Sequence, residues 1–193
     1  DLIRHVSTNG IAVAAVSETL TKPSKLRSYP IPGFRWITAP SNAYGRGFAF
    51  LLRQDIGCKH ETKTNGETCI LKLFFPDCKP LIVSGGCNRP NQTAALEEIL
   101  NHAEEHKGSP TPLFACGDFN SRHVSWCHSN NSSGLALHRR LSTANLSVCN
   151  PHLTTCVRHN GSSPVDILLA SHPHLCHNIY TSSHVGSAHL PVV

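Results

Sequence analysis

The sequence predicts a single domain of the α/β class, and three observations support this. The 193 residues suffice for one well-cored domain and are too few for two of ordinary size. With 39% hydrophobic and 15% charged residues, the composition is that of a globular protein. Short apolar runs of strand length also alternate with segments of helical periodicity. We therefore expect one domain over residues 1–193.

Strands are expected where apolar residues run between turn-forming residues. The predicted strands are residues 11–16, 34–38, 48–52, 69–75, 81–84, 112–116, 146–149, 155–158 and 165–170. The continuous run at 11–16 predicts a strand covered on both faces. The successive strands 48–52, 69–75 and 81–84 predict a meander.

Helices are expected in three segments with helical spacing of apolar residues. They are residues 1–7, residues 93–106 with Thr93 as the N-cap, and residues 135–143. In the last segment we expect Leu135, Leu137 and Leu141 to face the core.

The charge and cysteine content limit the classes of partner and compartment. The formal net charge of +5 and the 14 histidines suit a polyanionic partner, although such a charge is also common on proteins that bind no nucleic acid. Nine widely spaced cysteines without a Cys-x-x-Cys pair argue against a zinc cluster and a disulfide framework. We expect free thiols and a reducing compartment. No apolar stretch approaches the roughly 18 residues of a membrane span.

The central feature is the segment Gly117-Asp118-Phe119-Asn120, which ends the apolar run 112–116. This pattern predicts a buried strand that brings two polar side chains to a sheet edge. On an extended backbone Asp118 and Asn120 would point the same way, and Phe119 would point into the core. An acid beside an amide is a plausible hydrolytic pair. The alternative is a turn in which both side chains bond to their own backbone.

Two further carboxylates stand at predicted strand ends. Glu18 follows the run 11–16, and Asp166 interrupts the apolar run 165–170. A carboxylate in so apolar a strand is costly unless paired, so Asp166 is either a site residue or a buried structural acceptor. Read alone, Glu18 would be a solvated carboxylate and His189 a surface imidazole.

Together, these acids and His189 match the needs of phosphodiester hydrolysis with one divalent cation. That reaction requires oxygen ligands for magnesium, a base for water and a donor to the phosphorane. Four separated elements in this order favour a site over a simple turn at Asp118.

These segments are similar to the endonuclease/exonuclease/phosphatase family, and within it to the apurinic-endonuclease-like domain of non-LTR retrotransposon polyproteins. The similarity rests on Val16-Ser17-Glu18-Thr19, Gly117-Asp118-Phe119-Asn120, Ser163-Pro164-Val165-Asp166 and Ser187-Ala188-His189-Leu190-Pro191. The continuation Ser121-Arg122-His123-Val124-Ser125-Trp126 resembles the retroelement branch and favours it over repair enzymes.

The resemblance implies a fold, an activity and a role for each matching residue. The fold would be a four-layer α/β sandwich of two mostly antiparallel sheets flanked by helices. Glu18 would bind Mg²⁺, with Mn²⁺ as an alternative, and Asp118 would position or deprotonate water. Asn120 would hold the scissile phosphate, and Asp166 would orient His189, which stabilises the phosphorane. Thr155 would match a phosphate-contacting threonine.

The resemblance also implies partners and a location. The domain would nick double-stranded DNA to prime target-site reverse transcription by the remainder of the retrotransposon polyprotein. That role implies a nuclear protein with no membrane association.

Three departures from the family pattern leave alternatives open. The family's first strand, with a metal-site Asn, would precede residue 1. This, the absence of Met and the apolar run in which the sequence stops at Val192-Val193 lead us to expect a chain truncated at both ends. Ala188 stands where the family has an Asp. Cys87 or Asn88 stands where it has a phosphate-contacting Tyr, and we expect Asn88 to contact the substrate there. A catalytically dead remnant that retains the fold and weak DNA binding is therefore the main alternative. A phosphatase or phospholipase of the same superfamily is another, which the segment ending at Trp126 disfavours.

Overall fold

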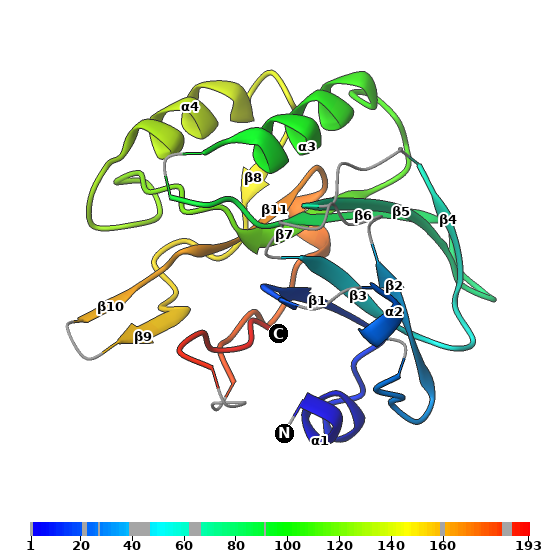
Figure 1. Ribbon diagram of the computed structural model, residues 1–193. Coiled ribbons are helices and arrows are strands. Elements are labelled where there is room, and N and C mark those ends of the chain that lie inside the picture. Colours follow the sequence, from blue (N-terminus) through cyan, green and yellow to red (C-terminus); the bar gives the residue numbers. More distant parts are fainter. Residues whose placement is uncertain are drawn as a thin grey trace.

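The structure is a computed structural model that describes residues 2–20, 23–26, 28–38, 47–61, 67–90, 92–158, 161–182 and 187–193. It has four layers, which are helices α3 and α4, a large sheet, a small sheet and helix α1 (Figure 1). The predicted four-layer α/β sandwich with two sheets is therefore confirmed. The predicted site residues Glu18 and Asp118 lie close together where the two sheets meet.

The large sheet has the strand order β4-β5-β6-β7-β11-β8 and is antiparallel except for the pair β6–β7. Its strands are β4 (Gly57–His60), β5 (Thr68–Phe74), β6 (Leu81–Gly86), β7 (Leu113–Asp118), β8 (Ser147–Val148) and β11 (Asp166–Ala170). Five of them match predicted strands with shifted ends. Strand β4 was not predicted because this mostly exposed edge strand has no apolar run.

The small sheet has the antiparallel order β1-β3-β2. Its strands are β1 (Val13–Ser17), β2 (Phe34–Thr38) and β3 (Phe48–Arg53). The predicted meander was wrong in one strand: β3 pairs with β1 and β2, and the meander consists of β4, β5 and β6. The prediction that the first strand is covered on both faces was also wrong. Among the described strands β1 lies at an edge, so it is half-buried and Ala15 is exposed.

Strands β9 (Cys156–Arg158) and β10 (Gly161–Ser163) form a separate antiparallel hairpin. It extends away from the two sheets beside the C-terminal segment (Figure 1). Strand β9 matches the predicted strand 155–158, whereas β10 has no apolar run and was not predicted. The remaining short elements are α2 (Pro23–Leu26) and a 3₁₀ helix, η1 (Pro173–Leu175).

Apolar side chains of both sheets fill the space between them. Phe48, Phe50 and Leu52 of β3 pack with Leu71 and Leu73 of β5. Gly85 makes this close approach possible, because a Cβ there would lie 2.1 Å from Cζ of Phe48. The sheets are thus held at a fixed spacing next to the strand ends that carry the acids.

Helices cover the outer faces of the two sheets. Helix α1 (Leu2–Thr8) confirms the prediction of 1–7, of which residue 1 lies outside the described residues, and Val6 packs beneath the small sheet. Helices α3 (Ala94–Glu105) and α4 (Ser132–Leu141) pack on the large sheet. The prediction for Leu135 was wrong, since this side chain is 38% exposed, whereas Leu137 is fully buried.

All nine cysteines are free thiols. None of the helices in the described part of the chain is long and apolar enough to cross a membrane.

Candidate active site

Two acids face each other at the ends of two neighbouring strands in the interior of the large sheet. Strand β7 ends at Asp118, and strand β11 begins at Asp166. The antiparallel register pairs these two residues directly, so their side chains lie on the same face. The structure therefore brings together two carboxylates that are far apart in the sequence.

The turn after β7 is fixed by a close backbone approach and by the Asp118 carboxylate. A Cβ at Gly117 would lie 1.9 Å from the Gly86 carbonyl oxygen, so only glycine fits there. Oδ1 of Asp118 accepts a hydrogen bond from the backbone N–H of Asn120 at 3.1 Å. Phe119 is fully buried, as predicted. Asn120 has a left-handed backbone with φ of 47°, so the expected extended geometry was wrong and Asp118 instead forms an Asx turn.

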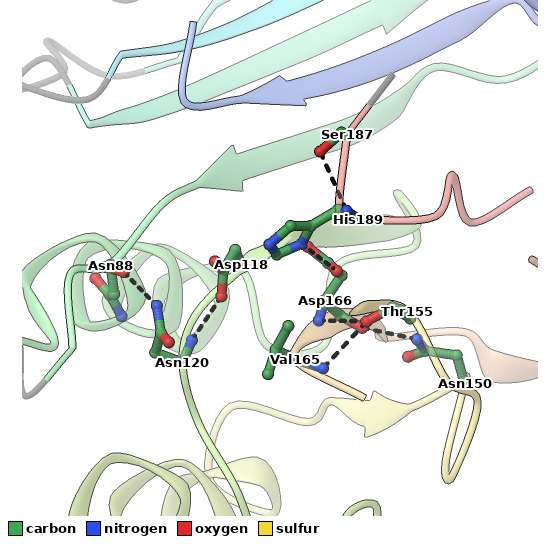
Figure 2. Close-up of polar contacts among 9 residues, drawn as sticks. All are labelled: Asn88, Asp118, Asn120, Asn150, Thr155, Val165, Asp166, Ser187 and His189. Atoms are coloured by element: carbon green, nitrogen blue, oxygen red, sulfur yellow. Dashed lines mark hydrogen bonds and ion pairs between the residues drawn. The ribbon is translucent and has the colours of Figure 1, made fainter. Parts of the chain in front are cut away.

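Asn120 is held from two sides. Its Nδ2 donates to the Asn88 carbonyl oxygen at 2.8 Å (Figure 2). Its backbone carbonyl accepts from Nδ2 of Asn131 at 2.7 Å. Asn131 also accepts the Gly134 N–H as the N-cap of α4. The position of Asn120 therefore depends on the start of helix α4.

Asn88 lies beneath the turn and is almost fully buried. Its backbone N–H donates to the Asp118 carbonyl at 2.9 Å, and its Oδ1 accepts from the Ala95 N–H at 3.0 Å. This bond caps the start of α3, where Thr93 makes no side-chain cap. The Asn88 side chain thus ties helix α3 to the Asp118 turn.

His189 and Asp166 form a hydrogen-bonded pair. Nδ1 of His189 lies 2.8 Å from Oδ2 of Asp166, with the two side chains 28% and 20% exposed (Figure 2). This bond raises the pKa of His189 above its ordinary value. Because Nδ1 faces the carboxylate, Nε2 is left for a substrate. Ser187 helps to fix the segment, since its Oγ accepts the His189 N–H at 3.1 Å.

Thr155 and Asn150 hold the start of β11. The buried Oγ1 of Thr155 accepts the N–H groups of Val165 and Asp166 at 3.1 and 2.9 Å. Nδ2 of Asn150 donates to the Asp166 carbonyl at 2.9 Å, and its Oδ1 accepts from the Leu168 N–H at 2.8 Å. Asn150 was not predicted, although its place just after β8 is the same kind of signal that marked Asn120.

The Thr155 segment also anchors the histidine. The Thr155 carbonyl accepts the Leu190 N–H at 2.6 Å, and the Ala188 carbonyl accepts the Val157 N–H at 2.8 Å. His189 therefore lies on the edge of β9, with Asp166 on its other side. Ala188 itself is exposed.

Glu18 reaches the same place from the small sheet. It directly follows β1 and has a φ of 55°. Ligand atoms of Glu18, Asp118 and Cys87 lie within 4.8 Å of one another, and those of Asp118, Asp166 and His189 do so as well. The structure thus contains acidic groups that suit a divalent metal ion at the junction of the two sheets.

The pKa of the buried Asp118 differs from that of an ordinary carboxyl group. Burial, reinforced by the negative charge of Asp166, raises the pKa of Asp118 to about 6. The Asn120 N–H and His189 oppose this shift, and Glu18 adds to it. Asp118 is therefore an acid that changes its protonation state close to neutral pH.

The segment from Ser121 to Trp126 is a packed loop. Trp126 is buried, and its Nε1 donates to the Ser121 carbonyl at 2.9 Å. The His123 ring stacks on His138 of α4 with centroids 3.9 Å apart. These contacts join the loop after Asn120 to helix α4.

Comparisons with known proteins agree with this fold. A family model described as endonuclease-reverse transcriptase matches residues 77–193. No significant match is found among curated protein sequences.

Several solved structures share the fold. The endonuclease domain of TRAS1, a telomere-specific non-LTR retrotransposon, matches with a TM-score of 0.78 at 18% identity, covering 98% of this chain and 87% of that one. The AP endonuclease LMAP from Leishmania major matches at 0.75 and 10% identity, with 99% and 80% covered. The mannosyl-6-phosphatase Bt3783 of Bacteroides thetaiotaomicron matches at 0.64 and 14% identity, with 99% and 87% covered. Because the family model covers more than half of its residues, this chain belongs to the endonuclease-reverse transcriptase family.

Proposed function

We propose that this chain is a divalent-metal-dependent DNA endonuclease that nicks double-stranded DNA and leaves a 3′-hydroxyl to prime target-site reverse transcription. The observation that carries the proposal is the convergence of Glu18, Asp118 and the Asp166–His189 pair from four separate segments. The likeness to the TRAS1 endonuclease domain supports a retrotransposon setting, with the rest of the polyprotein as partner and the nucleus as location.

Asp118 is the base in this proposal. Its pKa of about 6 suits a carboxylate that takes a proton from water near neutral pH. The water oxygen would bond to phosphorus as the bond from phosphorus to the 3′-oxygen breaks. The products would be a 5′-phosphate and a 3′-hydroxyl.

The Asp166–His189 pair would stabilise the negative charge that develops on the phosphorane oxygens. Because Asp166 accepts from Nδ1 and raises the pKa of His189, the ring retains a proton on Nε2 for a phosphorane oxygen. Asn120 uses one N–H of its amide on the Asn88 carbonyl, which leaves the second for the scissile phosphate.

The predicted phosphate contacts of Asn88 and Thr155 become supporting roles in this proposal. Both side chains are buried and bonded to backbone groups of α3 or β11. Asn88 would position Asn120, and Thr155 would position Asp166.

The donor set fits a hard divalent cation, and Mg²⁺ is our candidate. The carboxylate of Glu18, which lies beside Asp118, is a ligand of the kind that Mg²⁺ prefers, and Mn²⁺ accepts the same group. The buried Asp118 lies beside two other acids, an arrangement that a bound cation would stabilise. The chemistry supplied by a cation held there would be charge neutralisation at the phosphate.

Two alternatives rest on specific observations. Ala188 beside His189 offers no carboxylate, which favours a dead remnant that keeps the fold and weak DNA binding. A mannosyl-6-phosphatase has a similar fold, so the fold alone does not distinguish a nuclease from a phosphatase or phospholipase. A phosphatase or phospholipase is therefore the second alternative.

A plasmid assay tests the proposal. Supercoiled DNA is incubated with this chain or with an Ala188→Asp variant over a range of Mg²⁺ concentrations. We expect saturable nicking by Ala188→Asp and slower or no nicking by the unaltered chain. Asp118→Ala should abolish nicking, while the exposed Asp77→Ala should not. Extension of the nick by a DNA polymerase would identify the 3′-hydroxyl.

Each alternative has its own outcome in this assay. Nicking that survives Asp118→Ala would contradict the site. No effect of Mg²⁺ on either protein would favour the remnant. Release of phosphate from small monoesters without nicking would favour the phosphatase.

A further inference from the structure

A second group of metal-ligating side chains lies on the helix-covered face of the large sheet. Glu61 directly follows the edge strand β4, and its N–H donates to the Ile70 carbonyl of β5 at 3.0 Å. His102 lies in the last turn of α3 and His106 is its C-cap. Glu18 belongs to the small sheet on the opposite side, so this group is separate from the candidate active site (Figure 1).

The three side chains point to one place. Ligand atoms of Glu61, His102 and His106 all lie within 4.8 Å of one another. The two histidines are four residues apart, so their rings lie on one face of the helix. The rings are stacked with centroids 4.1 Å apart. Ligands about 2.1 Å from zinc lie roughly 3.4 Å from each other, a spacing that small side-chain rotations would reach here.

His102 lacks the partners that a buried imidazole requires. The residue is 5% exposed, and neither ring nitrogen has a hydrogen-bond partner among the residues that the structure describes. Buried polar atoms are ordinarily satisfied, so this ring needs a ligand that accepts its lone pair. A metal ion in the space shared with Glu61 and His106 would provide one.

His106 is oriented as metal-bound histidines usually are. Its Nδ1 lies 2.9 Å from the His102 carbonyl oxygen, and this bond leaves Nε2 as the ligand atom. In metal sites the second ring nitrogen commonly donates to a carbonyl or carboxylate in this way.

From these contacts we propose that Glu61, His102 and His106 form a zinc site that joins the end of β4 to the C-terminal turn of α3. Two imidazoles and one carboxylate suit zinc, whereas magnesium prefers oxygen ligands alone. Three protein ligands leave one position of a tetrahedral ion for water. The site fastens the edge of the large sheet to its covering helix.

Metal titration tests the site directly. The metal-free chain is titrated with ZnCl₂ in excess Mg²⁺, which occupies oxygen-rich sites, and bound zinc is measured by calorimetry and elemental analysis. We expect one zinc per chain and a tenfold or larger loss of affinity in Glu61→Gln and His106→Gln. His177→Gln changes an exposed histidine and serves as the matched control, which should bind as the unaltered chain does.

Cobalt(II) gives a second readout, because its visible absorption reports nitrogen ligands in a low-coordinate site. The spectrum should be lost in His102→Gln, with circular dichroism to confirm folding, and retained in Asp118→Asn. Zinc binding lost in Asp118→Asn but kept in His106→Gln would locate the ion at the other site and overturn the proposal. Equal affinity of His106→Gln and His177→Gln would overturn it as well.

Discussion

Asp118 and Asp166 are directly paired across strands β7 and β11, and this pairing places two carboxylates on one face of the sheet edge. His189 bonds to Asp166, while Asp118 is left buried with a pKa raised to about 6. The two acids thus have different environments, which allows one to act as a base and the other to hold an imidazole. Four predictions follow from the surroundings of this pair.

Replacing the buried acid should stabilise the metal-free protein. The pKa of the Asp118 carboxyl is near 4 in the unfolded protein and about 6 in the folded protein. Between about pH 4 and pH 6, the carboxyl therefore holds a proton in the folded state that it has lost in the unfolded state. Stability therefore falls as the pH rises through this window. Asp118→Asn should raise the free energy of unfolding by about 1–3 kcal/mol at pH 7 and by little at pH 3.5.

Urea denaturation at both pH values measures this difference. Asp77→Asn is the control, because its side chain is exposed and should show no such gain. A loss of stability in Asp118→Asn at pH 7 would mean that Asp118 stabilises the fold rather than serving a reaction.

The Asp166→Asn variant should shift the titration of His189 to lower pH. The bond to the Asp166 carboxylate is the main reason that the pKa of His189 is raised, and a neutral amide cannot replace that charge. NMR titration of the imidazole protons would show the lower pKa, with the exposed His177 as internal reference. If nicking is measured, its decline on the alkaline side should begin at lower pH in the variant. An unchanged titration of His189 would contradict the pairing.

Much of this arrangement could be predicted from sequence because strand ends are marked locally. Apolar runs that stop before Glu18 and Asp118 indicate both the strand and the polar residue that follows it. The pairing of Asp166 with Asp118, in contrast, depends on the register of strands far apart in the chain. Only the family resemblance suggested that His189 joins Asp166.

The supporting asparagines were harder to predict. Asn131 was not predicted, because it acts through a bond to the backbone of another segment. The supporting roles of Asn88 and Asn150 likewise depend on contacts with distant segments. The edge position of β1 was missed for a similar reason, since an apolar run does not reveal how many neighbours a strand has. Leu135 was misplaced because it lies two residues before the buried Leu137, which puts it about 200° around the helix, on the opposite face.

Gly134 should be irreplaceable even though it lies within helix α4. A Cβ there would meet the Arg122 carbonyl oxygen at 1.8 Å, so Gly134→Ala must displace the loop that follows Asn120. We expect a loss of about 1–3 kcal/mol despite the better helix propensity of Ala. Gly57→Ala is the control, because its nearest neighbour is at an ordinary 3.4 Å. Thermal unfolding of both variants tests this, and equal melting temperatures would contradict the close packing.

Thr155 should contribute to stability and nicking through the hydrogen bonds of its side-chain oxygen rather than through packing of its methyl group. Thr155→Val keeps the volume but removes the acceptor for the N–H groups of Val165 and Asp166, in a fully buried place. Unpaired buried groups of this kind cost about 1–3 kcal/mol. Because Asp166 bonds to His189, we expect the same change to slow nicking more than it weakens DNA binding.

Thr155→Ser distinguishes this role from packing or direct contact with substrate. This variant retains the oxygen and loses only a methyl group. It should therefore keep most of the nicking rate, and its free energy of unfolding should fall less than that of Thr155→Val. Stability is measured by urea denaturation, and nicking is compared in rate and in half-saturating DNA concentration. If Val lowers only DNA affinity and leaves stability unchanged, Thr155 contacts phosphate directly. If Thr155→Ser lowers stability and the nicking rate as much as Thr155→Val does, the effect comes from the lost methyl group. The hydrogen bonds to β11 would then not be what positions Asp166.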